Sequence, residues 1–180
     1  MIDADVALLA QIAQGDTSAI KQMVSNKLPR LLALATRMLG DRAEAEDVAQ
    51  ETFVKIWNQA PLWKPELAKF DTWMHRVALN LCYDRLRTKS DNHTQTLDDD
   101  ADEPIDLSLK PDEKIIASQQ KDQLGTALKA LPNRQREALV LQYYQELSNT
   151  EAASVMNISV DALESLLSRA RRNMRLLLSS

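Results

Sequence analysis

The sequence predicts an all-α protein made of two small helical domains joined by an acidic flexible linker. The chain of 180 residues has three glycines and six prolines, while Leu, Ala, Arg, Glu and Gln are abundant. This balance favours helix over strand, because unbranched side chains lose little rotamer freedom on a helix. Apolar residues recur at helical spacing on both sides of residues 88–111, a segment without such a period. A compact domain seldom contains so long a loop, so this segment marks a boundary.

The net charge of −4 is concentrated in the same part of the chain. Residues 88–112 hold eight acidic and two basic side chains, so the remainder is slightly basic. With Pro104, Pro111 and many Asp, Ser and Thr residues, this segment is expected to be extended or disordered. The expected boundaries are 1–88 for the first domain, 89–111 for the linker and 112–180 for the second domain.

Four helices are expected in the first domain. Gly15 ends the first of them, which begins near Ala4, and Asp16 caps the second. Pro29 either begins a new helix or kinks the existing one, which ends at Gly40. The other two are expected from the cap at Asp41 through Ile56 and, after a loop with Pro61, Trp63 and Pro65, from about Asp71 to Thr88.

The second domain carries the spacing of a helix-turn-helix. Ala153 allows a close approach of two helices, Asn157 can adopt the positive φ of the turn, and Leu163 locks the helices together. The helices are expected near 115–128, from 133 to 145 after a break at Leu131-Pro132, from a cap at Ser148 to Met156, and from a cap at Ser159 to the end.

The final helix is expected to have one apolar and one polar side. Its apolar side consists of Leu163, Leu166, Leu167, Ala170, Met174 and Leu177. Its polar side includes Asp161, Glu164, Ser165, Ser168, Arg171, Arg172 and Arg175, with Arg169 at the edge. Such arginines can neutralise phosphates while the N-terminal polar residues meet base edges in the major groove. The alternative is a helical hairpin with a solvated, charged outer face.

A second polar stripe lies on the helix expected from Asp71. Arg76, Asn80, Tyr83 and Arg87 follow one another at steps of four, three and four, so they share a face. Guanidinium groups, an amide and a phenol ring together suit an unpaired DNA strand. The alternative is a solvated stripe with a partly buried tyrosine.

The helix capped by Asp41 has an acidic stripe that would not approach DNA. Its members are Glu44, Asp47, Glu51, Lys55 and Asn58. The stripe is therefore either solvated or faces a protein partner.

No catalytic constellation, cofactor loop or metal-ligand spacing is found, and we expect a protein that is not an enzyme and binds no cofactor, metal or small-molecule substrate. Cys82 is expected to be a small buried hydrophobe. No apolar run approaches the roughly 20 residues of a membrane span, and the acidic start is unlike a secretory leader. We therefore expect a cytoplasmic protein without membrane insertion.

Three stretches, taken in order, resemble segments of one family. Residues 41–53 (DRAEAEDVAQETF) are similar to the sigma-factor segment that docks on the clamp of RNA polymerase, and residues 70–80 (FDTWMHRVALN) resemble its promoter-melting and −10 recognition helix. A third set of residues resembles the start of a −35-binding domain: Leu131-Pro132 with Arg134, Arg136 and Glu137, then Leu147-Ser148 and Glu151-Ala152-Ala153. The chain thus resembles an extracytoplasmic-function sigma factor of the sigma-70 family.

This resemblance implies a sigma-2-like helical bundle, a sigma-4-like helix-turn-helix domain and a role for each stripe. Core RNA polymerase would be contacted by Asp47, Gln50 and Glu51. The −10 strand would meet the loop around Trp63 together with Arg76, Asn80, Tyr83 and Arg87. The −35 duplex would meet Glu164, Ser165, Ser168, Arg169, Arg171, Arg172 and Arg175. The partners implied are core RNA polymerase, promoter DNA and an anti-sigma factor, which could hold the protein near the membrane.

Two positions depart from many relatives, which have basic residues where this chain has Glu164 and Leu166. Glu accepts a hydrogen bond from cytosine N4, whereas Arg prefers guanine, so the −35 preference would differ. Leu166 is expected to pack on the apolar side of its helix. Two other functions are kept as alternatives: a helix-turn-helix regulator that acts without being a polymerase subunit, and a helical adaptor for protein interaction.

Overall fold

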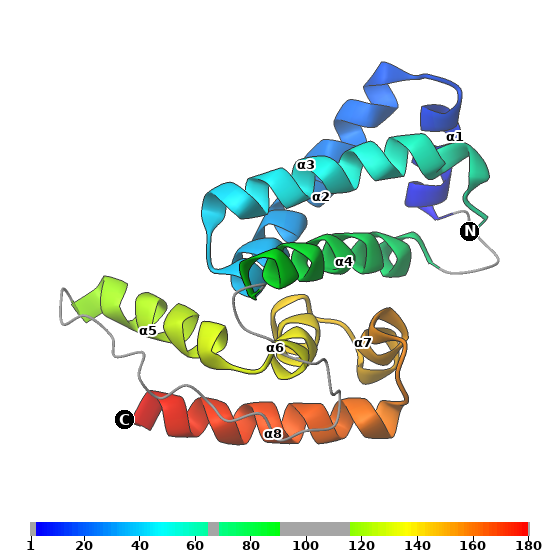
Figure 1. Cartoon of the computed structure of the whole chain (residues 1–180). Helices are drawn as coiled ribbons and strands as arrows, with labels where there is room; N and C mark the ends of the chain where they lie inside the picture. The colour runs from blue at the N-terminus through cyan, green and yellow to red at the C-terminus, as the bar shows by residue number, and fades with distance from the viewer. Residues whose placement is uncertain (1–2, 65–68, 91–115, 180) are drawn as a thin grey trace.

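The computed structural model describes residues 3–64, 69–90 and 116–179, and within these ranges all regular structure is helical (Figure 1). The prediction of an all-α fold of two domains is confirmed. The first domain consists of α1 (Ala4–Ala13), α2 (Thr17–Leu39), α3 (Arg42–Gln59), the 3-10 turn η1 (Ala60–Leu62) and α4 (Phe70–Ser90). The second consists of α5 (Ile116–Ala130), α6 (Asn133–Leu139), the π-helical turn η2 (Val140–Tyr144), α7 (Asn149–Met156) and α8 (Val160–Ser179).

The helices begin at the caps that the sequence predicts. A carboxylate oxygen of Asp16 accepts a hydrogen bond from the amide of Ser18 (2.9 Å), and one of Asp41 accepts from the amide of Glu44 (3.1 Å). The hydroxyl oxygen of Ser148 accepts likewise at the start of α7. These caps satisfy amide donors that have no partner within the first turn.

The structure decides one alternative left open by the sequence and moves one helix end. Of the two alternatives for Pro29, a new helix does not begin there: Pro29 lies inside α2, which continues through it to the left-handed cap at Gly40 (φ +69°). The last helix of the first domain extends to Ser90, two residues beyond the expected boundary. The acidic segment that follows, residues 91–115, lies outside the described residues.

The helix expected over residues 133–145 is present through Tyr144 but changes its hydrogen bonding part-way. After Leu139 the chain widens into η2, where the amide of Gln145 donates to the carbonyl oxygen of Val140 (2.9 Å), a spacing of five residues instead of four. Glu146 then adopts a positive φ of +56°. This wider turn places Gln145 against the first domain.

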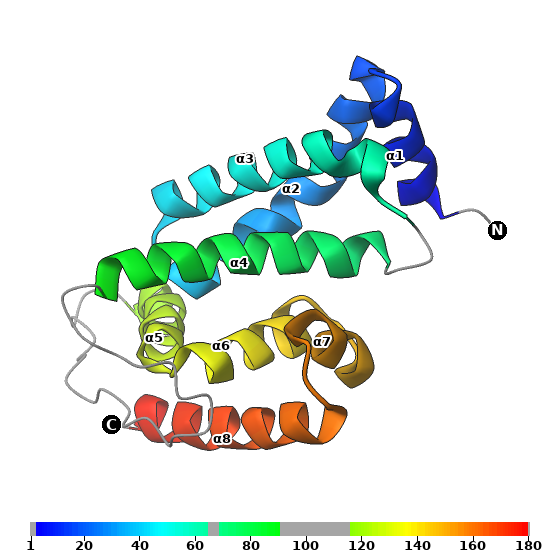
Figure 2. The ribbon, with the colours of Figure 1, turned by 45° about the vertical axis from the view of Figure 1, so that its right-hand side comes forward.

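The two domains pack against each other and share buried side chains. Leu34, Met38 and Met74 of the first domain belong to the same buried cluster as Leu141 and Leu163 of the second. α4 contacts α7, and α2 contacts α5, α6 and η2. Figures 1 and 2 show α4 lying between α2 and α3 on one side and α6 and α7 on the other. We call this packing the closed arrangement.

An ion-pair cluster ties the N-terminal helix to the rest of the first domain. The ammonium group of Lys27 in α2 lies 2.9 Å from a carboxylate oxygen of Asp5 in α1 and 2.8 Å from one of Asp71 in α4. Burial lowers the pKa of Lys27, but the hydrogen bonds and charges of Asp71 and Asp5 outweigh it, so the pKa is raised overall. Lys27 therefore stays charged and joins three helices.

Candidate polymerase- and DNA-binding surfaces

The acidic face of α3 is exposed and partly neutralised by α4. Asp47, Gln50 and Glu51 all point to solvent. A guanidinium nitrogen of Arg85 in α4 lies 2.9 Å from Glu51 Oε1, and another lies 3.9 Å from Asp47 Oδ2. Arg85 was not among the expected contact residues, because a helical period does not show which neighbouring helix a charged side chain will reach.

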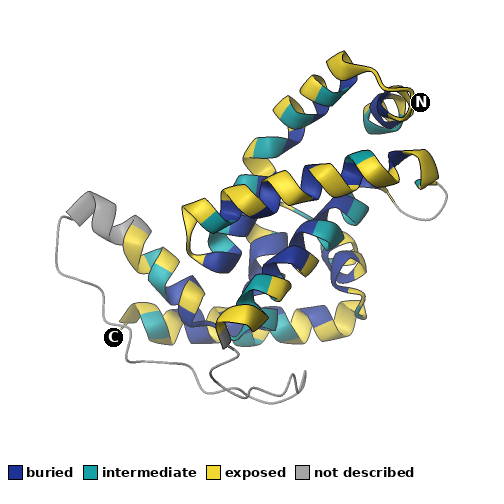
Figure 3. Ribbon diagram, turned by 45° about the horizontal axis from the view of Figure 1, so that its top comes forward, coloured by how far each residue is buried: buried dark blue, intermediate teal, exposed yellow. Residues whose placement is uncertain are grey.

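The arginine-rich face of α8 is open to solvent. Leu163, Leu167, Ala170 and Met174 are buried and Leu166 is partly buried against the core, so the predicted apolar side is confirmed. Figure 3 shows buried and exposed residues alternating along this helix. Glu164, Ser165, Ser168, Arg171, Arg172 and Arg175 are exposed, and Arg169 is half-buried.

The turn before α8 has the predicted helix-turn-helix geometry. Asn157 has a φ of +57° and its amide donates to carbonyl oxygens of α7, which ends the helix. Ala153 and Leu163 are both buried at the contact of α7 with α8. The hydroxyl of Ser159 accepts from the amide of Ala162 and caps α8. The N-terminal half of α8 is therefore held at a fixed angle to α7.

Part of the polar stripe of α4 faces the second domain instead of solvent. Arg76, Asn80 and Tyr83 line a cavity of about 380 Å³ together with residues of α6 and α7. The guanidinium group of Arg76 donates to the carbonyl oxygen of Ser154, and the hydroxyl of Tyr83 donates to the carboxylate of Glu137. In the closed arrangement Arg76 and Tyr83 are therefore half-buried against the second domain, whereas Asn80 stays exposed.

The other two residues expected near the −10 strand lie apart from this cavity. Arg87 is exposed and forms an ion pair with Asp84 one turn earlier. Trp63 follows η1, and its ring lies 6.3 Å from that of Trp73 and 6.2 Å from that of Phe70, measured between ring centroids. Residues 65–68 of this loop lie outside the described residues. Arg87 and Trp63 therefore lie beyond the two ends of the part of the stripe that lines this cavity.

Burial sets the ionisation of the groups on the covered face. Burial, followed by the charge of Glu137, raises the pKa of Tyr83, so its phenol stays neutral and donates a hydrogen bond. Burial lowers the pKa of Arg136. Burial also raises the pKa of Cys82 to about 12, so its thiol is inert at neutral pH, and the prediction that Cys82 is a buried hydrophobe is confirmed.

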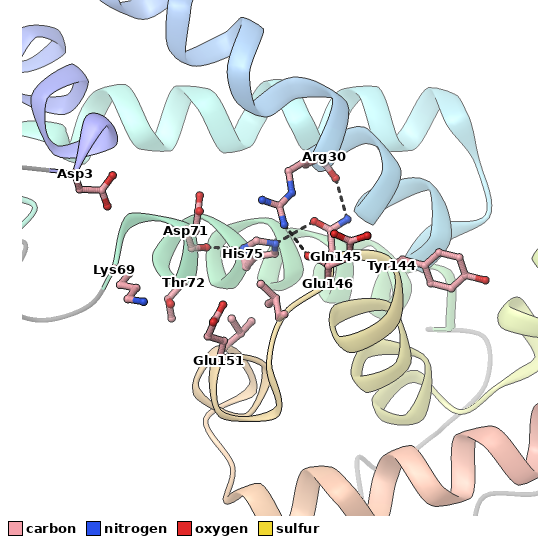
Figure 4. Close-up of a pocket in the computed structure, with 12 residues that line it drawn as sticks. Asp3, Arg30, Lys69, Asp71, Thr72, His75, Tyr144, Gln145, Glu146 and Glu151 are labelled. Atoms are coloured by element: carbon pink, nitrogen blue, oxygen red, sulfur yellow. Dashed lines mark hydrogen bonds between the residues drawn. The ribbon is translucent and has the colours of Figure 1, made fainter.

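A second cavity, of about 660 Å³, lies between α2, α4 and the segment after η2 (Figure 4). The imidazole of His75 lies between the carbonyl oxygen of Asp71 (Nδ1, 2.6 Å) and the side-chain oxygen of Gln145 (Nε2, 3.1 Å). A guanidinium nitrogen of Arg30 donates to the carbonyl oxygen of Gln145 (2.7 Å). Sequence reasoning missed Arg30, His75 and Gln145 as contact residues, because each belongs to a different helix or turn and no spacing links them.

The described part of the chain offers neither a metal site nor a membrane span. It contains no group of three or more His, Cys, Asp or Glu side chains able to hold a metal ion. Among the same residues no helix is long and apolar enough to cross a membrane.

The comparisons identify the two domains. The family model described as Sigma-70 region 2 matches residues 23–91, and the one described as Sigma-70, region 4 matches residues 121–174. The RNA polymerase sigma factor CnrH of Cupriavidus metallidurans is 30% identical over 99% of this chain and 96% of its own length. The ECF RNA polymerase sigma factor SigW of Bacillus subtilis is 28% identical over 93% of this chain and 92% of its own length.

Solved structures agree with this assignment. The structure of CnrH in complex with the cytosolic domain of CnrY superposes with a TM-score of 0.69 at 28% identity, covering 98% of each chain. RpoE of Bartonella quintana, in a complex with the anti-sigma factor NepR, superposes with a TM-score of 0.66 at 24% identity, covering 88% of this chain and 96% of that one, and supports the fold. The matched regions define a sigma-70 type initiation subunit. The chain belongs to the sigma-70 family, in the extracytoplasmic-function (ECF) group of sigma factors. Regions 2 and 4 of these proteins bind core RNA polymerase and promoter DNA.

Proposed function

We propose that this chain directs RNA polymerase to its promoters: it docks on the core enzyme through α3, binds the −35 duplex through α8 and captures the opened −10 strand through α4. The observation that carries the proposal is the exposed face of α8, the second helix of the helix-turn-helix. This face carries Arg171, Arg172 and Arg175 in the C-terminal half of the helix. Backbone phosphates attract such a row of arginines, and the polar residues ahead of it can reach base edges.

Docking on the core enzyme is assigned to Asp47, Gln50 and Glu51. Their exposure supports this role, because interfacial charges must be reachable in the free protein. Arg85 holds two of these side chains in place before docking, and a positively charged site on the polymerase would compete with it for the carboxylates.

Reading of the −35 element is assigned to the N-terminal turns of α8. Glu164 and Ser165 stand exposed in the second turn, where a recognition helix meets the bases. The carboxylate of Glu164 favours cytosine, whose N4 amino group is a donor in the major groove. Ser168 and Arg169, one turn further on, complete this surface.

Capture of the −10 strand is assigned to Arg76, Asn80 and Tyr83, with Trp63 and Arg87 at the two ends of the stripe. A phenol ring stacks on an unpaired base, and guanidinium groups bind the strand's phosphates. Because Arg76 and Tyr83 are bonded to the second domain in the closed arrangement, while Asn80 is exposed, the domains must separate before the strand can contact all three residues. The expected domains 1–88 and 112–180, with the linker 89–111 between them, provide the two bodies for such a movement.

In this proposal the polymerase performs the phosphodiester chemistry in the cytoplasm and the chain contributes recognition alone. An anti-sigma factor is proposed as the inhibitory partner, because the similar structure of RpoE is a complex with the anti-sigma factor NepR and that of CnrH is a complex with the cytosolic domain of CnrY. Such a partner could hold the chain near the membrane until it is released.

The proposal is tested by run-off transcription with purified core polymerase and a promoter library, with and without this protein. We expect transcripts from a defined subset of promoters when the protein is added. If the protein neither binds sigma-free polymerase nor selects any promoter, the proposed function is wrong. DNA binding without polymerase binding would instead favour a regulator that acts alone.

A further inference from the structure

A polar pair interrupts the apolar contact between α6 and α8, two helices that lie side by side in the second domain (Figure 1). Asn173 lies on the buried side of α8 between apolar neighbours such as Ala170 and Met174, and 9% of it is exposed. Its side-chain nitrogen donates a hydrogen bond of 2.7 Å to the side-chain oxygen of Gln135 in α6, which is 5% exposed. Each buried amide therefore has the other as a partner.

This hydrogen bond is directional, whereas the apolar packing around it is not. Ala170 and Met174 form a cluster with Leu128 and Leu139, and the free energy of such a cluster depends on the area removed from water. A small rotation or slide of α8 would keep most of that area buried. The same movement would leave two buried amides without partners, which costs free energy. One polar residue on an apolar helix face fixes the register of coiled coils for the same reason.

The direction of Asn173 determines which side chains of α8 face outward. Successive residues of an α-helix are about 100° apart, so Arg171 and Arg175, each two residues away, lie about 160° from Asn173 around the helix axis. Glu164, nine residues earlier, lies about 180° from it. With Asn173 directed at α6, these three side chains point away from the domain, and all three are exposed.

We propose that Gln135 and Asn173 are positioning residues for −35 recognition: their hydrogen bond fixes the rotation of α8 on α6 and so directs Glu164 at the bases. This inference rests on the proposed function and adds two residues that touch no DNA. The pair serves specificity and not stability, because apolar side chains of the same shape in place of both amides leave stability nearly unchanged or raise it.

The double variant Gln135→Met with Asn173→Leu tests this role in the full chain assembled with core polymerase. Its side chains keep nearly the same shapes but form no hydrogen bond. The probes are a labelled −35 duplex from a promoter found by run-off transcription and a duplex of the same composition in scrambled order. We expect the ratio of the two affinities to fall about tenfold, the discrimination that one good base contact provides. The affinity for the scrambled duplex should be unchanged, because it depends on phosphate contacts.

Met174→Leu is the matched control. Met174 adjoins Asn173 on the buried side of α8, with 7% exposed, and this substitution repacks the contact at similar volume without removing a hydrogen bond. We expect it to keep the parent's ratio of affinities. The exchange of Gln135→Asn with Asn173→Gln restores a pair of amides of the same total length. We expect it to recover most of the discrimination that the double apolar variant loses.

Stability and hydrogen exchange complete the test. Urea unfolding should give the double apolar variant a free energy of unfolding equal to or above that of the parent, and an unfolded variant would overturn the inference. Nuclear magnetic resonance of the parent needs no variant: the side-chain amide of Asn173 should exchange slowly with solvent, and rapid exchange would also overturn it.

The two duplexes separate failure of the inference from failure of the proposed function. Discrimination by the parent that survives in the double apolar variant, or that is lost equally in Met174→Leu, would make the positioning role alone wrong. If the parent itself bound both duplexes equally, the proposed reading of the −35 element would be wrong, and the inference with it.

Discussion

The guanidinium group of Arg76 donates two hydrogen bonds to one main-chain oxygen, that of Ser154, with Nε at 3.2 Å and Nη2 at 2.5 Å. Ser154 lies in the last turn of α7, where its carbonyl oxygen also accepts from the amide of Asn157 and the helix dipole favours a cation. The guanidinium group that we propose to bind a DNA phosphate thus binds the end of a helix in the other domain. Substitutions in the α4 stripe test the proposed contacts with DNA directly.

Tyr83→Ala should impair promoter opening more than polymerase binding. Loss of one stacked aromatic costs about 1–3 kcal/mol per base, so the yield of open complex should fall roughly 5- to 100-fold. Permanganate footprinting measures opening, and gel filtration with core enzyme measures binding. Tyr143→Ala, at an exposed tyrosine of the second domain, is the control and should change neither. Equal loss of both activities in Tyr83→Ala would contradict the assigned role.

Arg172→Ala should weaken binding to −35 duplexes of any sequence, because the helix loses a contact with a phosphate. The slope of log affinity against log salt should then fall in magnitude by about 1, which a salt titration measures. Arg42→Ala, at an exposed arginine of α3, is the control for the titration.

Glu164→Ala should instead change which −35 sequence is preferred, by about 1–3 kcal/mol at one base pair. A selection from randomised promoters measures this preference. An unaltered consensus for Glu164→Ala would refute the assignment.

Glu51→Gln should weaken binding of core polymerase roughly 3- to 10-fold, because the side chain loses a charge at the docking face. Fluorescence anisotropy with purified core enzyme measures the affinity. Glu151→Gln, an exposed acid at the start of α7, is the matched control and should bind as the parent does. Affinity equal to the parent in Glu51→Gln would remove this residue from the docking surface.

Lys27→Met should lower the free energy of unfolding by about 1–3 kcal/mol, because Asp5 and Asp71 lose a charged partner. The pKa of Lys27 is raised in the folded state, so its contribution is complete below the unfolded value of about 10.4 and is lost as the pH rises past the folded value. Urea unfolding should therefore give the same difference at pH 6 and pH 9. Lys21→Met, at an exposed position of α2, should be neutral, and a difference that shrinks by pH 9 would disprove the assignment.

Cys82 should react very slowly with iodoacetamide in the native protein at pH 8. The thiolate is the reactive form, and a pKa of about 12 keeps its fraction small, while burial blocks access. In urea the same cysteine should react at the rate of an ordinary thiol. Mass spectrometry of the alkylated chain measures both rates, and rapid native labelling would show that α4 is less well covered than described.

Much of the local structure could be predicted from the sequence. Caps at Asp16, Asp41 and Ser148, and the turn at Asn157, follow from short-range hydrogen bonds and from φ preferences, which depend on a few neighbouring residues. The two sides of α8 followed from the helical period for the same reason.

The contact between the domains could not be predicted. Arg76 and Tyr83 look alike in a sequence whether DNA, water or another helix faces them, because a period shows only that side chains share a face. The π-helical turn at Val140 was missed since its wider hydrogen bonds depend on packing against α2. The position of Gln145 follows from that turn.

The buried cluster shared by the two domains has a consequence for the opened chain. Leu34 and Leu141 are buried in one continuous core in the closed arrangement, and separation of the domains would expose more of this core to water. Exposure of apolar surface to water costs free energy, so the extended form is expected to be short-lived in isolation. A large partner that covers this apolar surface in place of the other domain would stabilise the extended form. Separation of the domains is therefore expected to be coupled to binding of that partner.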